Sequence, residues 1–141
     1  MLSELYTGGV LDAAAAIPPA HRLTSPDASA VKVSRVCGSE VAVDLEIKDG
    51  IVTALGMEAN ACALGQASAS IVARNIVGAK ISELYRLRDE MRAMLKDNGP
   101  VPSGERWAEL AMLAPIHDYP QRHASTLLVF EAVCACLDQL S

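Results

Sequence analysis

Residues 41–57 constrain the fold of this chain more than any other segment. Over residues 41–48 the larger hydrophobic side chains occupy every second position, with small or charged residues between them. This period of two is typical of a β-strand that buries one face. The pair Asp49-Gly50 follows, and both residues tolerate the positive φ of a two-residue hairpin turn. Residues 51–57 supply the second arm, so the segment predicts an antiparallel hairpin.

A third strand is predicted just before this hairpin, and helices are predicted after it. Residues 30–36 also alternate, and beyond residue 60 the apolar spacing lengthens to three or four residues, which is typical of helices. Because strands come first and helices later, we expect an α+β fold: a three-stranded antiparallel sheet packed against C-terminal helices. The expected helices are a short one over residues 3–16, then 65–77, one after Ser82, 105–113, and a last one from Arg122 to the end.

Size and composition exclude several classes of protein. The 141 residues suit one domain, 1–141, with no repeat and no long linker. A net charge of −5 and an aromatic content of 4% argue against nucleic-acid binding, which uses basic patches and aromatic platforms. No apolar run approaches the ~20 residues of a membrane helix, and no signal peptide is expected. We therefore expect a cytoplasmic protein without a membrane partner.

The chain has 4 cysteines to explain. In a reducing compartment, cysteines are more often metal ligands, nucleophiles or core residues than disulfide partners. Cys134 and Cys136 fall on different apolar stripes of the last helix, and we expect both in the core.

The other two thiols lie where chain segments change direction. Cys37 sits in VCGSEV between the first two strands, where it could reach a metal or fill the sheet end. Cys62 precedes the Ala- and Ser-rich helix, whose dipole favours a thiolate at that end. The alternative for Cys62 is a buried thiol among small residues.

A histidine follows much later in the chain. His123 lies in the first turn of the last helix, a position that favours the neutral imidazole a metal ligand needs. A surface histidine is the alternative. Arg122 beside it could pair with an anion or be solvated. Two sulfur donors and one nitrogen donor would suit zinc or iron if the fold brought them together.

The order of these segments resembles a known family. The stretches VCGSEVAVDLEIKDGIV and ACALGQASASIVA, with a late helix beginning H-x-S-x-L, are similar to the iron–sulfur cluster scaffold proteins of the IscU, SufU and NifU N-terminal type. The resemblance implies a platform that holds a nascent [2Fe–2S] cluster, iron or zinc. It further implies sulfur supply by a cysteine desulfurase and delivery to cluster-accepting apo-proteins. On this resemblance Cys37 and Cys62 match the first two cysteine ligands, and His123 matches the histidine before the third.

Two positions depart from the family pattern. Ser39 stands where the family usually has aspartate, and Ala124 stands where it has the third cysteine. The expected ligand set is therefore Cys37, Cys62 and His123, with Ser39 and Arg122 as weak or outer contacts. Such a site binds cargo weakly unless water, a thiol cofactor or another subunit completes it.

The resemblance leaves three hypotheses open. The first is a scaffold that carries its cargo without turning over substrate itself. The second is a zinc-dependent sulfurtransferase that accepts persulfide sulfur on a cysteine. The third is a partner-binding module that keeps the fold but has lost the metal site. In each case we expect a monomer or a weak dimer.

Overall fold

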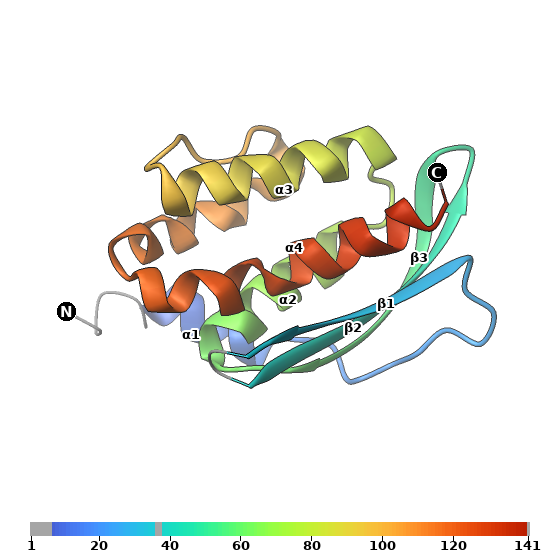
Figure 1. Cartoon of the computed structure of the whole chain (residues 1–141), viewed down its shortest axis with the longest axis horizontal. Helices are drawn as coiled ribbons and strands as arrows, with labels where there is room; N and C mark the ends of the chain where they lie inside the picture. Colours follow the sequence, from blue (N-terminus) through green and yellow to red (C-terminus); the bar gives the residue numbers. More distant parts are fainter. Residues whose placement is uncertain (1–6, 36–37, 141) are drawn as a thin grey trace.

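The computed structural model of the protein describes residues 7–35 and 38–140. One sheet with strand order β1-β2-β3 is covered by helices on its inner face, which confirms the predicted α+β class (Figure 1). The elements in chain order are α1 (Gly8–Ala15), β1 (Ala28–Ser34), β2 (Ser39–Lys48), β3 (Ile51–Asn60), α2 (Ala63–Asn75), α3 (Ile81–Lys96), the 3-10 segments η2 (Glu105–Asp118) and η3 (Pro120–Arg122), and α4 (His123–Asp138).

The predicted hairpin is present with its predicted turn. Strands β2 and β3 are antiparallel, and Lys48 pairs with Ile51 across the turn. Asp49 has φ 55° and Gly50 has φ 76°, so both turn residues lie in the left-handed region that the Asp-Gly pair predicts. Strands β1 and β2 are also antiparallel, which places β2 in the centre of the sheet.

Helix α4 is the central element of the core. Figure 1 shows it lying between the sheet and α3, with α2 beside it. Its side chains are buried on nearly every side, as expected for a helix that is apolar all round. From the sheet it meets the inner-face residues Val41, Val43 and Leu45, of which each is 1% exposed or less. This aliphatic core agrees with the low aromatic content.

The outer face of the sheet differs from the expectation. Alternation places Asp44 on a wetter face, but its side chain is only 1% exposed. Residues 21–23 cross this face, where His21 bridges to Met57 of β3 and Arg22 pairs with Asp44. The segment between α1 and β1 therefore forms part of the sheet's covering, although its proline-rich and polar sequence is typical of a free loop.

Element boundaries also differ in places. The structure extends β2 and β3 by two and three residues beyond the predicted ends, to Ser39 and Asn60. The stretch between the predicted helix 105–113 and the predicted last helix is mostly 3-10 helix, since η2 continues through Pro115 to Asp118 and η3 follows at Pro120. A proline cannot donate to an α-helical ladder, and 3-10 geometry is the common alternative in short stretches. Within residues 7–35 and 38–140, no helix is long and apolar enough to cross a membrane.

Candidate metal centre

The beginnings of α2 and α4 meet at one end of the molecule (left in Figure 1). Cys62 is the N-cap residue of α2, and its Sγ lies 3.5 Å from Ser125 Oγ in the first turn of α4. Gly65 permits this approach, because a Cβ there would lie 2.8 Å from the Ala61 Cβ and 3.2 Å from the Ser125 carbonyl oxygen. The fold thus brings the Cys62 thiol to the first turn of the helix that carries His123.

His123 is buried, at 6% exposure, and its ring is held in one orientation. Its Nε2 lies 2.9 Å from the Ile116 carbonyl oxygen and 3.1 Å from that of His117. Carbonyl oxygens only accept hydrogen bonds, so Nε2 carries a hydrogen and donates to both. In the neutral ring Nδ1 is then the nitrogen with a free lone pair. Metal-binding histidines are commonly fixed in this way through their other ring nitrogen.

The 3-10 segment η2 supplies both carbonyls that hold this ring. It is itself tied to α3, because His117 Nδ1 lies 2.7 Å from the Leu95 carbonyl oxygen. His117 is therefore a half-buried, hydrogen-bonded residue of η2 and not a solvated loop residue. The surface alternative for His123 is wrong, since its side chain is buried.

The ends of β1 and β2 lie at the same end of the molecule. Ser39 begins β2, pairs with Ser34 and is 3% exposed. The next residue of β2 is paired with Asn60, two positions before Cys62. Ser39 therefore lies at the end of the sheet from which β3 leads into α2, and it has interactions of its own. Its role as a weak or outer contact stays a prediction. Cys37, the remaining predicted ligand, lies outside the described residues.

Arg122 fixes the first turn of α4 through its carbonyl oxygen, and its side chain carries a buried Nε–H donor without a partner among the described residues. Its carbonyl oxygen accepts hydrogen bonds from Ser125 Oγ at 3.3 Å and Thr126 Oγ1 at 2.9 Å, which fixes the first turn of α4. Its Nε is buried and has no acceptor among residues 7–35 and 38–140. A buried donor without a partner costs about 1–3 kcal/mol, so an anion near this guanidinium would be stabilised.

The two thiols of α4 are core residues, as predicted. Cys134 is 2% exposed and Cys136 is fully buried. Burial raises the pKa of Cys134 to about 11 and that of Cys136 to about 12. The Cys136 thiol donates to the Val43 carbonyl oxygen at 3.2 Å. Both thiols therefore remain protonated at neutral pH, and neither is a suitable soft-metal ligand.

Among the described residues, no group of three or more His, Cys, Asp or Glu side chains is close enough to hold a metal ion. The structure brings Cys62 to the helix start that His123 occupies, and the third predicted donor falls on an undescribed residue. Sequence reasoning missed Ser125 as the neighbour of the Cys62 thiol. The H-x-S spacing of the last helix is the signal that could have found it.

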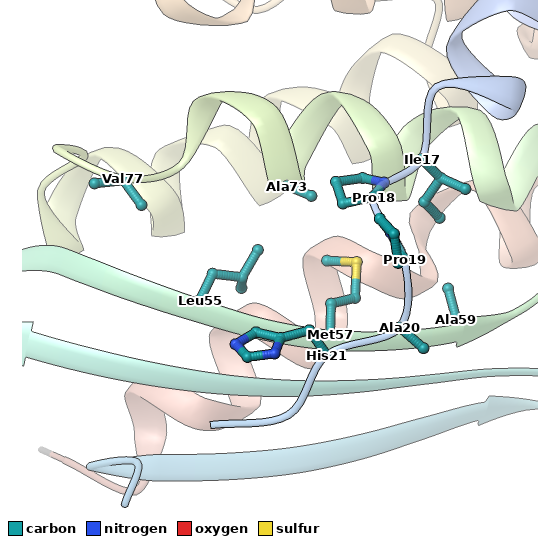
Figure 2. Close-up of a pocket in the computed structure, with 10 residues that line it drawn as sticks. All are labelled: Ile17, Pro18, Pro19, Ala20, His21, Leu55, Met57, Ala59, Ala73 and Val77. Carbon is teal, nitrogen blue, oxygen red and sulfur yellow. The ribbon is translucent and has the colours of Figure 1, made fainter. Parts of the chain in front are cut away.

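A separate cavity of about 360 Å³ lies under the edge strand β3 (Figure 2). It is closed by residues 17–21 on one side and by Ala73 and Val77 on the other, with Leu55 and Met57 on β3. None of the predicted ligands lines it. This cavity is mainly apolar and is distinct from the candidate metal centre.

Comparison with known proteins agrees with the fold. The family model of the NifU-like N-terminal domain matches residues 5–126. The chain therefore belongs to this family of scaffold proteins, which includes the IscU, SufU and NifU types. An iron–sulfur cluster assembly scaffold protein IscU from Thermotoga maritima is 27% identical over 110 residues, 74% of this chain and 72% of that protein.

Two solved structures are similar over nearly the whole chain. A NifU-like protein (N-terminal) from Brucella abortus has a TM-score of 0.95 and 46% identity, and the match covers 99% of this chain and 96% of that one. A protein described as a scaffold for the SUF system from Fervidobacterium islandicum has a TM-score of 0.81 at 18% identity, with 94% and 96% covered. At that identity the second likeness concerns the fold alone.

Proposed function

We propose that this protein is a carrier in iron–sulfur cluster assembly whose cargo is a nascent [2Fe–2S] cluster, iron or zinc, held by Cys37, Cys62 and His123. The observation that carries the proposal is the contact between Cys62 and the first turn of α4, where His123 keeps Nδ1 free as a donor. A cysteine desulfurase would supply the sulfur and apo-proteins would receive the cluster. Residues 1–141 would act as one domain in the cytoplasm.

The donor chemistry fits this cargo. Thiolate sulfur and imidazole nitrogen are preferred ligands of zinc, and thiolates hold iron–sulfur clusters. A hard cation such as Mg²⁺ would prefer oxygen ligands. The buried Nε of Arg122 adds to the argument, because a thiolate-bound cluster is anionic and would supply the missing acceptor. Ser39 adds at most a weak hydroxyl contact, since serine is a poor ligand for soft metals.

The incomplete ligand set favours a carrier over a structural metal site. Structural zinc sites normally fill four positions with protein side chains, whereas sites with an open position exchange ligands. Here the family's third cysteine is replaced by Ala124, which is exposed on α4. A cargo held by three protein donors can leave by exchanging ligands at its open position.

The test is metal analysis and a visible spectrum of protein purified without oxygen, repeated after adding iron, sulfide and a reductant. The expected result is a spectrum typical of a [2Fe–2S] centre, or stoichiometric zinc. Replacing Cys62→Ser keeps the volume but removes the soft ligand. We expect an affinity loss at least as large as the 10–100-fold that follows loss of an outer contact to a ligand. Cys134→Ala is the control, because that thiol is buried and protonated.

The histidine has its own matched pair of variants. His123→Asn removes the Nδ1 donor, whereas His21→Asn changes an exposed histidine outside the site. Zinc affinity should fall only in the first. Equal affinity in Cys62→Ser, His123→Asn and the parent protein would reject the assignment of the ligands.

A second candidate function is sulfur transfer, and one observation favours it. Among the described thiols, Cys62 is partly exposed at a helix start, while those of α4 are buried. It could accept sulfur as a persulfide beside a bound zinc ion. Incubation with a desulfurase and cysteine, followed by mass spectrometry of Cys37 and Cys62, tests this. Stoichiometric partner binding without metal or persulfide would instead indicate a binding module.

A further inference from the structure

A groove of about 490 Å³ lies along α4, and Ala124, the residue after His123, is one of the residues that line it. Its floor is the α4 face that presents Ala124, Leu127 and Leu128. One wall is the end of β1, and the other is the C-terminal half of α3. Ala124 follows His123 in the chain and is exposed, so the groove reaches the first turn of α4. The groove is separate from the cavity of Figure 2.

The charge of this groove opposes that of the protein. It is lined by Lys32, Arg92 and Lys96 and by one carboxylate, Glu131, in a chain of net charge −5. Arg92 is neutralised by Glu131, because its Nε and one terminal nitrogen donate to the carboxylate at 2.8 and 2.6 Å. Lys32 and Lys96 are exposed and have no ion pair among residues 7–35 and 38–140. Two free cations therefore face an apolar floor, which favours a small anion with an apolar body.

The length of the groove limits the size of that anion. From Ala124 to Glu131 the helix rises about 10 Å at 1.5 Å per residue. A molecule that spans this length of the groove is therefore of tripeptide size. The volume of about 490 Å³ is within the range of small-molecule sites.

From this geometry we infer that the groove binds a low-molecular-weight thiol that carries carboxylates, with its sulfur beside Ala124. The lysines would hold the carboxylates, and Leu127 and Leu128 would contact the body of the molecule. The inference rests on the proposed function in one respect: the thiol would lose its proton to solvent and occupy the open ligand position. The methyl group of Ala124 leaves room for a sulfur that the protein itself does not provide.

The first experiment measures binding to the metal-free, full-length protein. Reduced glutathione and S-methylglutathione are the probes, because they share carboxylates while only the first has a free thiol. Both should shift the backbone amide resonances of Ala124 and Leu128. Lys96→Glu should weaken both probes on the order of fivefold, as expected for reversal of one exposed charge. Lys48→Glu, at the distant β2–β3 turn, should leave both affinities unchanged.

The second experiment locates the sulfur. In Ala124→Cys, the introduced thiolate can attack glutathione disulfide, forming a mixed disulfide and releasing one glutathione thiolate. The rate of mixed-disulfide formation with glutathione disulfide is divided by the rate with uncharged hydroxyethyl disulfide, which corrects for the intrinsic reactivity of the introduced thiol. Peptide mapping identifies the cysteine that is modified. Adding Lys96→Glu should lower this ratio on the order of fivefold, and adding Lys48→Glu should not.

The outcomes separate this inference from the proposed function. If neither probe moves the groove resonances, or if the rate ratio is the same in all variants, the inference is wrong even where zinc still binds. If the probes bind but the protein never holds a metal or cluster, the proposed function fails and the inference about the groove still stands. If both hold, glutathione should tighten zinc binding more than S-methylglutathione does, and Ala124→Cys should abolish that difference.

Discussion

Asp44 is the side chain whose loss should most clearly expose how the outer face of the sheet is held. Its carboxylate is 1% exposed and accepts hydrogen bonds from Arg22 at 2.6 and 2.8 Å, Ser29 Oγ at 2.6 Å and the Leu23 backbone N–H at 3.0 Å. Asp44→Asn removes the charge and turns an NH₂ group toward these donors. We expect it to loosen the segment that crosses β2 and β3.

The magnitude follows from the exposure of the two partners. Removing one member of a buried ion pair costs about 3–5 kcal/mol when the other charge stays buried. The Arg22 side chain is 44% exposed, so its guanidinium can turn to water after the change. The free energy of unfolding should therefore fall by about 3 kcal/mol, the low end of that range. This is a large share of the ~5–15 kcal/mol of a typical domain.

The pH dependence gives a second signature. The Arg22 hydrogen bonds hold the pKa of Asp44 well below its usual value. A lowered folded-state pKa stabilises the protein above the unfolded pKa, near 3.8, and this contribution is lost as the pH falls toward the folded value. The difference between the parent and Asp44→Asn should therefore be full at neutral pH and shrink progressively in acid below about pH 4.

Urea unfolding followed by the fluorescence of Trp107, which is buried, measures both effects. Glu58→Gln is the control, since Glu58 is an exposed carboxylate of β3 on the same face and should change stability by less than about 0.5 kcal/mol. A cost for Asp44→Asn no larger than that of Glu58→Gln would refute the reasoning. So would a difference from the parent that persists unchanged in acid.

Two further predictions concern the candidate centre and its thiols. Gly65→Ala should destabilise the protein by about 1–3 kcal/mol and weaken zinc binding, because the added Cβ would meet Ala61 and α4. Gly8→Ala is the control, since a Cβ there would have no atom within 4 Å. Thermal unfolding and zinc titration should show both effects for Gly65→Ala and neither for Gly8→Ala. Under native conditions iodoacetamide should label Cys62 well before Cys134 or Cys136, whose pKa values burial raises to about 11 and about 12; mass spectrometry that found similar labelling rates would contradict this order.

The parts of the fold that could be predicted depend on neighbouring residues. The Asp49-Gly50 turn is set by the backbone freedom of two adjacent residues, and the helical spacing repeats within single segments. The burial of Asp44 could not be predicted, because its partner Arg22 is 22 positions away and alternation alone assigns a carboxylate to solvent.

In the candidate site too, features that depend on neighbouring residues could be predicted and features that depend on distant residues could not. Its residue types could be selected from the sequence, but the contact between Cys62 and Ser125 joins positions 63 apart. The choice of Nδ1 as the free nitrogen of His123 depends on two carbonyls of η2, a segment whose 3-10 geometry no local pattern indicated. The ligand role of Cys37 stays a prediction.

In the proposed centre, the donors that the structure holds in place and the open ligand position should affect a cargo differently. The His123 ring is held by two carbonyl acceptors, and the close approach of α2 to α4 at Gly65 sets the position of Cys62, so we expect these two proposed donors to adjust little to different metals. The position of the absent third cysteine, Ala124, is exposed and continuous with a basic groove. Selectivity should therefore come from the fixed donors, while the rate of cargo release should depend on whatever occupies the open position. Changes at Lys32 or Lys96 should accordingly alter release rates more than they alter which metal is bound.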